Sequence, residues 1–151
     1  MDINLNNTIN VLTTSLNKNE QIYSNVLNIA KQMQASLTAE NEIQLLELLE
    51  AKNNLMAEAM VINQNADPFR KFWDDHFSEA EENVRNDLKI KVEAISEYIQ
   101  EILEIDAKLQ TDIEIIKKKQ NENSKQMNNI RKLQSAYGEE SLKNQFIDKS
   151  E

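Results

Sequence analysis

The residues best suited to chemistry lie around the single histidine of the chain. His76 follows Asp74 and Asp75, and an imidazole beside two carboxylates could bind a metal ion weakly. The chain has no cysteine, so no thiol nucleophile or thiolate metal site can be built around this histidine. A di-iron helical bundle needs two Glu-x-x-His motifs, which one histidine cannot supply. We therefore interpret His76 as a surface or half-buried residue near a helix end, and we expect no metal site.

Carboxylates recur at helical spacing in the second half of the chain. Acid–base catalysis needs carboxylates in different environments inside a pocket, whereas carboxylates along one regular helix surface share the same solvent. A glycine-rich phosphate loop is excluded because the chain has one glycine. The sequence thus predicts no catalytic residue, no cofactor and no enzymatic activity. The carboxylates of this predicted solvated face are Glu93, Glu97, Glu101 and Glu104.

Composition predicts which elements must carry these residues. The 151 residues include one glycine and one proline, and folds with many turns need far more of both. Aromatic residues make up 5% of the chain, so the core must be built mainly from aliphatic side chains and methionine. We predict an all-α fold, an elongated antiparallel helical bundle or coiled coil, with a single domain over residues 1–136.

Apolar side chains at alternating steps of three and four residues predict the first helix, over about residues 3–35. Asn19 is the one polar member of that series. Thr38 is the expected N-cap of a second helix over about residues 39–66, although one kinked helix through this point is an alternative.

The only proline follows Asp67, and this pair predicts the start of a short helix over residues 68–77. Large aromatic side chains at a helix connection usually bury against it, so we interpret the aromatic cluster as a plug that closes the bundle. A patch that binds a partner is the alternative. The cluster consists of Phe69, Phe72, Trp73 and Phe77.

A helical pattern then continues from residue 79 to about residue 135, which predicts a very long C-terminal helix of about 85 Å. The shorter helices cannot cover that length, so its C-terminal part should project or oligomerise. Asp106 interrupts the apolar stripe, and we expect it to be solvated there; a role in setting register is the alternative. Gly138 is the expected stop signal, and residues 137–151 should form a mobile tail.

Charge and hydropathy limit the classes of partner. The net charge of −9 argues against a protein that binds a nucleic-acid backbone. The N-terminus lacks the basic and apolar regions of a signal peptide, and no apolar run is long enough to cross a bilayer. We expect a cytoplasmic protein without membrane insertion that binds other proteins, and a homodimer is left open.

The chain resembles the flagellar export chaperones of the FlgN and FliT type. The resemblance rests on its small acidic helical character and on three segments: Leu48–Leu55, which resembles an LL-x-x-K-x-x-L helix; Leu133–Gly138; and the F-I-D-K segment Phe146–Lys149. It implies a protein that holds the helical end of a late flagellar protein, such as a hook-associated or filament-cap protein. Such a chaperone prevents premature assembly and delivers its client to the export apparatus.

Two sets of site residues follow from the resemblance. An amphipathic client helix is expected against the stripe of the long helix, a predicted client-binding seam of Ile95, Ile99, Ile102, Leu109, Ile113 and Ile116. Contact with the export machinery is expected from the tail residues Tyr137, Phe146 and Ile147. A homo-oligomeric structural coiled coil or scaffold without a chaperone role is one alternative, and a regulator of a toxin or secretion system is another.

Overall fold

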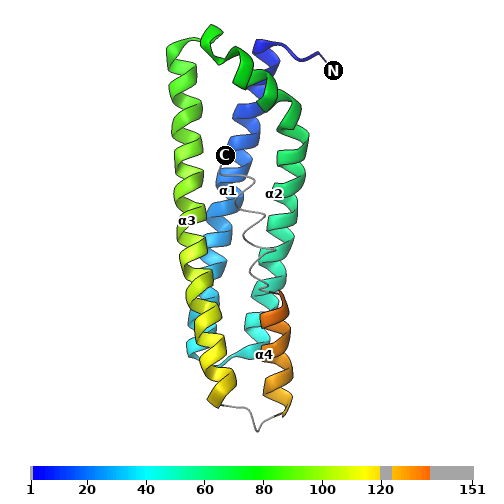
Figure 1. The fold of residues 1–151 in the computed structure, drawn as a ribbon, viewed down its shortest axis with the longest axis vertical. Helices are drawn as coiled ribbons and strands as arrows, with labels where there is room; N and C mark the ends of the chain where they lie inside the picture. Colours follow the sequence, from blue (N-terminus) through cyan, green and yellow to red (C-terminus); the bar gives the residue numbers. More distant parts are fainter. Residues whose placement is uncertain (1, 120–123, 137–151) are drawn as a thin grey trace.

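The fold is entirely helical in the part of the chain that the structure describes, residues 2–119 and 124–136 of a computed structural model. The predicted all-α class is confirmed. The helices run antiparallel along one long axis, and successive long helices are joined at the two ends of the molecule (Figure 1). The elements in chain order are α1 (Leu5–Thr38), α2 (Glu42–His76), a 3-10 turn (Phe77–Glu79), α3 (Glu82–Lys119) and α4 (Ser124–Ala136).

Asparagine side chains cap the first two helices. The Asn4 side chain accepts a hydrogen bond from the Asn7 backbone N–H at 2.9 Å, and Asn41 accepts one from the Gln44 N–H at 3.1 Å. The predicted N-cap at Thr38 is wrong, because Thr38 is the last residue of α1 and its hydroxyl donates to the Gln34 carbonyl oxygen. The chain does break between the two helices, in a turn where Glu40 has a φ of 56°.

Pro68 lies inside α2, so the predicted separate helix over residues 68–77 is wrong. Proline lacks a backbone N–H and clashes with the preceding turn, which kinks a helix without necessarily ending it. The last turns of α2 bend across the end of the bundle toward the start of α3 (Figure 1). α3 begins at Glu82 and not at residue 79, because Phe77–Glu79 form a 3-10 turn and Ala80 is extended.

α1 is the shared neighbour of the two other long helices. It packs along both α2 and α3, whereas α2 and α3 make few contacts with each other among the described residues. The main core cluster fills the space between these helices with aliphatic side chains, methionine and Tyr23. Its fully buried members include Val26, Met33, Met56 and Ile102.

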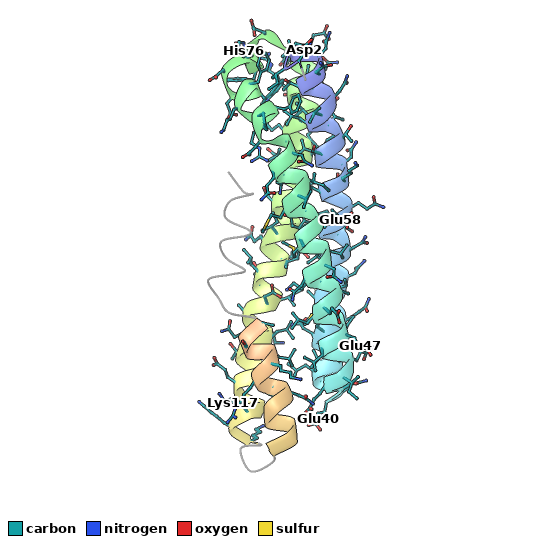
Figure 2. All side chains as sticks on the ribbon, turned by 90° about the vertical axis from the view of Figure 1, so that its right-hand side faces the viewer. Asp2, Glu40, Glu47, Glu58, His76 and Lys117 are labelled. Atoms are coloured by element: carbon teal, nitrogen blue, oxygen red, sulfur yellow. The ribbon has the colours of Figure 1, made fainter. Side chains whose placement is uncertain are left out.

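The predicted single helix to about residue 135 is wrong, because the chain reverses direction after α3. α4 lies beside α2 and α3 at the end of the molecule that holds Glu40 and Lys117 (Figures 1 and 2). The Asn129 side chain donates to the Glu42 carboxylate at 3.0 Å. Ile130 and Leu133 are buried in the same core cluster as Leu45. The apolar residues that were expected to project therefore fold back onto the bundle.

Candidate binding groove

A cavity of about 730 Å³ lies between α1, α2 and α3 at the end of the molecule opposite α4. α4 occupies the space between α2 and α3 at its own end only, as far as the chain is described. The cavity is the continuation of that space toward the C-terminal end of α2. We call it the α2–α3 cavity, and its position is that of a fourth helix which the described chain does not supply.

The walls of the α2–α3 cavity are largely apolar. α1, α2 and α3 each contribute aliphatic side chains, because the inward stripe of each helix continues past the point that α4 reaches. Val92 is 45% exposed, so an apolar side chain of this wall is in contact with solvent. The aliphatic lining consists of Leu12, Leu16, Ala66, Leu88, Val92 and Ile95.

The bend of α2 at Pro68 brings the aromatic cluster over one end of the cavity. Phe69 is buried against Leu12 and Leu88, and this contact joins all three long helices. Trp73 and Phe77 line the cavity, and Phe77 remains 49% exposed. The two interpretations of the aromatic cluster therefore apply to different residues: Phe69 closes the bundle, while Trp73 and Phe77 face the cavity.

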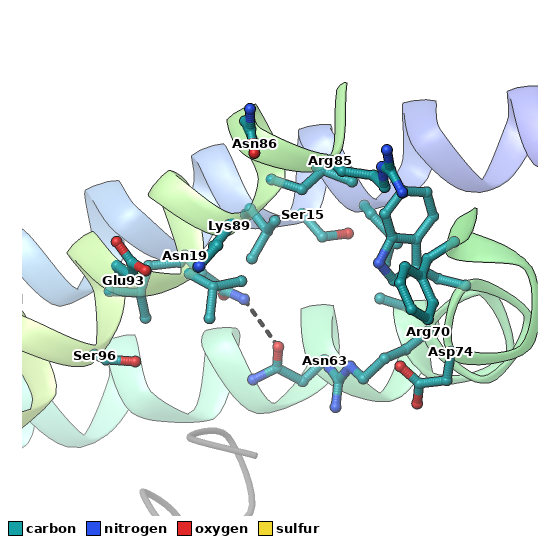
Figure 3. A pocket seen from close by; sticks show the side chains of 18 of the residues that line it. Ser15, Asn19, Asn63, Arg70, Asp74, Arg85, Asn86, Lys89, Glu93 and Ser96 are labelled. Carbon is teal, nitrogen blue, oxygen red and sulfur yellow. Dashed lines mark hydrogen bonds between the residues drawn. The ribbon is translucent and has the colours of Figure 1, made fainter. Parts of the chain in front are cut away.

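Two asparagines form the polar floor of the cavity. The Asn19 Nδ2 group donates to the Asn63 Oδ1 atom at 2.8 Å, joining α1 to α2 (Figure 3). Asn19 is only 5% exposed, and its own Oδ1 atom accepts no hydrogen bond from the described residues. Tyr23 lies beside this pair; burial raises the pKa of its hydroxyl above the ordinary value, and Asn63 offsets part of the rise. A pair of amides that are hydrogen-bonded to each other is thus buried beside an apolar cavity.

The rim of the cavity carries balanced charge. Three cationic residues and three carboxylates from α2 and α3 surround the apolar walls, and Figure 3 shows five of them, Arg70, Asp74, Arg85, Lys89 and Glu93. Arg70 makes an exposed ion pair with Asp67 at 3.4 Å, which contributes little in water. The local charge is therefore close to neutral, although the whole chain carries −9. The rim residues are Arg70, Arg85, Lys89, Asp74, Glu82 and Glu93.

A buried ion pair joins α2 to α3 beyond the cavity. The Lys52 Nζ and Asp106 Oδ1 atoms are 2.5 Å apart, with side-chain exposures of 0% and 7%. Burial lowers the pKa of Lys52 and raises the pKa of Asp106, and the attraction between the two opposes both changes. The expectation that Asp106 is solvated is wrong, because α3 has not left the bundle at this level. Its partner, 54 positions away, lies within the segment that carries the family resemblance.

The predicted client-binding seam is internal in this structure. Ile99, Ile102, Leu109 and Ile113 are buried in the main core cluster, and Ile116 packs partly buried against it. Of the six residues, only Ile95 lines the cavity. An apolar stripe shows that a helix needs partners but not whether they belong to the same chain, and here α1, α2 and α4 supply them. Apart from Ile95, the predicted seam residues therefore lie in or against the core and line no part of the α2–α3 cavity. The predicted tail residues Tyr137, Phe146 and Ile147 lie outside the described residues.

His76 lies near the exposed end of α2. Its ring stacks on Phe72 with 4.1 Å between ring centroids, and its Nδ1 atom lies 2.8 Å from Glu79 Oε2. Within residues 2–119 and 124–136, no group of three or more metal-ligating side chains comes together. The four carboxylates of the predicted solvated face are exposed, as expected. Over the same part of the chain, no helix combines the length and apolar character needed to cross a membrane.

The sequence contained two signals that point to this site. Asn19 was visible as a polar interruption of the first apolar stripe, and the same pattern of interruption marks Asn63 on α2. Their contact could not be read from the sequence, because it depends on how two helices align. Comparisons with protein-family models, with curated proteins and with solved structures give no match.

Proposed function

We propose that this protein holds an amphipathic helix of another protein in the α2–α3 cavity, as a cytoplasmic export chaperone. One observation carries the proposal: α4 fills the space between α2 and α3 at one end of the bundle, and at the other end the same space is an apolar cavity. An amphipathic helix that completes a bundle is the partner that such a groove accommodates.

The dimensions of the cavity favour a helix over a small ligand. On α3, its lining extends over 14 positions from Glu82 to Ser96, which corresponds to about 20 Å or four helical turns. A partner helix of four turns would bury its apolar face against Leu16, Trp73 and Val92 while its polar face met solvent.

The identity of the partner rests on the sequence resemblance. Flagellar export chaperones shield the helical ends of late flagellar proteins, and such ends are amphipathic segments that would otherwise assemble. We therefore propose a hook-associated or filament-cap protein as the client, with delivery to the export apparatus as the outcome. The groove supports the holding of a helix; the resemblance alone supports the flagellar client.

The test combines calorimetry with two variants that differ by two positions. The full chain is titrated with the purified helical end regions of the hook-associated and filament-cap proteins of the same organism. We expect an equimolar complex that Val92→Glu weakens at least about tenfold, because it places a carboxylate in the apolar wall. Ile90→Glu is the control, since Ile90 is 62% exposed and does not line the cavity.

Two results contradict the proposal. One is the absence of binding to every client region. The other is binding that Val92→Glu leaves unchanged, which would move the contact to another surface. Light scattering separates the scaffold alternative, for which we would expect a stable homo-oligomer that does not dissociate when client is added.

A further inference from the structure

α4 ends in the space between α2 and α3 and is directed toward the α2–α3 cavity. The helix runs from Ser124 to Ala136 in the same direction as α2, and it packs against both α2 and α3 (Figure 1). The cavity lies further along the same space, on the side toward which α4 points. A chain that continues in this direction from Ala136 therefore meets the cavity.

The distance from the end of α4 to the cavity is short enough for the residues that follow to cover it. The hydrogen bond between Asn129 and Glu42 aligns α4 with α2, so Ala136 lies near the level of Leu49, each about seven positions further along its helix. Asn63, where the cavity lining begins on α2, is about 14 positions or 21 Å beyond Leu49. An extended chain advances about 3.3 Å per residue, so it reaches the cavity about seven residues after α4 ends.

The sequence within that reach contains an adjacent apolar pair. The apolar side chains of residues 139–151 are Leu142, Phe146 and Ile147. Phe146 follows Ala136 by ten residues, which span up to about 33 Å when extended but only about 15 Å as a helix. Reaching the cavity thus requires a largely extended chain, and Gly138 is a residue that favours the end of a helix.

We infer that the α2–α3 cavity is the docking site of residues 143–149 of the same chain, with Phe146 and Ile147 against its apolar walls. These side chains cover the apolar surface of Val92, which is 45% exposed in the cavity wall. Because the segment is tethered to α4, its effective concentration at the cavity is roughly millimolar, so weak apolar contacts are enough to keep it bound. The inference goes beyond the proposed function and does not depend on it, although this segment and a partner helix cannot occupy the cavity together.

The test uses disulfide cross-linking, since the chain has no cysteine of its own. One variant combines Val92→Cys with Ile147→Cys, and its control combines Ile90→Cys with Ile147→Cys. Val92 lines the cavity, whereas Ile90 is 62% exposed and does not line it. With oxidised glutathione at low protein concentration, we expect the first variant to form a bond within one chain at least about tenfold faster than the control. Non-reducing electrophoresis and peptide mass spectrometry measure the two rates.

A second measurement leaves the walls of the cavity unaltered. We expect Phe146→Asp with Ile147→Asp to make amide hydrogen exchange in residues 88–96 of α3 at least about threefold faster, because the bound segment no longer stabilises them. The control is Asn144→Asp with Gln145→Asp, which adds the same charge beside the apolar pair and should leave this exchange unchanged.

Three results would overturn the inference. The first is cross-linking at equal rates in the two cysteine variants. The second is a bond that forms only between two chains, which would assign the cavity to a second copy of the protein. The third is exchange in residues 88–96 that is the same in the two aspartate variants.

Discussion

Lys52 and Asp106 are oppositely charged side chains at a depth where the rest of the core is aliphatic. Desolvation disfavours both charges, and their mutual attraction offsets that cost only because the two atoms are in direct contact. Such a pair contributes little net stability, but removing one member is strongly unfavourable. The pair also fixes the alignment of α2 against α3, which otherwise make few contacts.

We predict that Asp106→Leu lowers the free energy of unfolding by about 3–5 kcal/mol at pH 7, because Lys52 loses the carboxylate with which it pairs. The decrease in the free energy of unfolding caused by Asp106→Leu should become smaller as pH rises. Burial already lowers the pKa of Lys52, and without Asp106 that pKa falls further. Between the lowered pKa and the ordinary value of 10.5, the unfolded chain binds more protons, so stability increases with pH. Urea unfolding at pH 7 and pH 9 measures both effects.

The matched control is the double variant Lys52→Met with Asp106→Leu, which replaces the ion pair with apolar side chains. We expect it to be about as stable as the unaltered chain or more so, and to lack the additional pH dependence of Asp106→Leu. A single variant as stable as the unaltered chain would show that the carboxylate does not support the buried ammonium.

The sequence predicted one half of this pair. Asp106 interrupts an apolar stripe, which indicates either a solvated position or a residue that sets the register of the helices. Lys52 interrupts the apolar series Leu45, Leu49, Met56 and Ala59 of α2 in the same way, but a lysine within a helix is ordinarily solvated, so this interruption alone does not predict a buried ion pair. Pairing the two requires the alignment of helices 54 residues apart, and no local pattern encodes it.

At the scale of elements, the composition predicted long helices correctly, but it did not predict where they turn. The helical spacing continues on both sides of residues 120–123, which favoured one unbroken helix. The run Asn121-Glu122-Asn123-Ser124 is a sequence signal against an unbroken helix, because Asn and Ser favour turns and helix caps over helix interiors. At Pro68 the sequence predicted a helix start where α2 in fact continues, because a kinked helix and a new helix have the same local sequence signature.

The packing of α4 against α2 and α3 leads to a prediction about stability. Leu133→Ala should lower the free energy of unfolding by about 2–4 kcal/mol, because Leu133 is 1% exposed and packs in the main core. The adjacent Lys132 is exposed, so Lys132→Ala serves as the control and should change stability by less than about 0.5 kcal/mol. Thermal and urea unfolding compare the two. Equal, small effects would instead agree with a helix that projects from the bundle.

At the scale of the whole molecule, the two ends of the bundle are built differently. At the end with the α1–α2 turn, four helices surround the core, and at the other end the described chain supplies three helices around the α2–α3 cavity. Local stability follows the number of buried contacts, so the cavity end should open more readily. This asymmetry could not be predicted from the sequence, because it follows from the position of α4.

Amide hydrogen exchange should reveal the asymmetry within one helix. We predict that residues 82–96 of α3, which border the cavity, exchange at least about tenfold faster than residues 99–113, which lie in the main core. Mass spectrometry of peptides from the two segments measures the difference, and residues 99–113 serve as the internal control. Addition of a bound helix should slow exchange in residues 82–96 selectively. Uniform protection along α3 would mean that the cavity end is as tightly held as the core.

α1 also has a mechanical consequence as the shared neighbour of α2 and α3. Because α2 and α3 each pack against α1 and make few contacts with each other, each can rotate about its contact with α1. The Lys52–Asp106 ion pair joins α2 to α3 at one level and limits their separation there. On one side of this pair α4 packs against both α2 and α3, and on the other side α2 and α3 are joined through Phe69, which packs with Leu12 and Leu88, and through the Phe77–Glu79 turn. We therefore expect α2 and α3 to be held least firmly beside the α2–α3 cavity, where no fourth helix of the described chain packs between them.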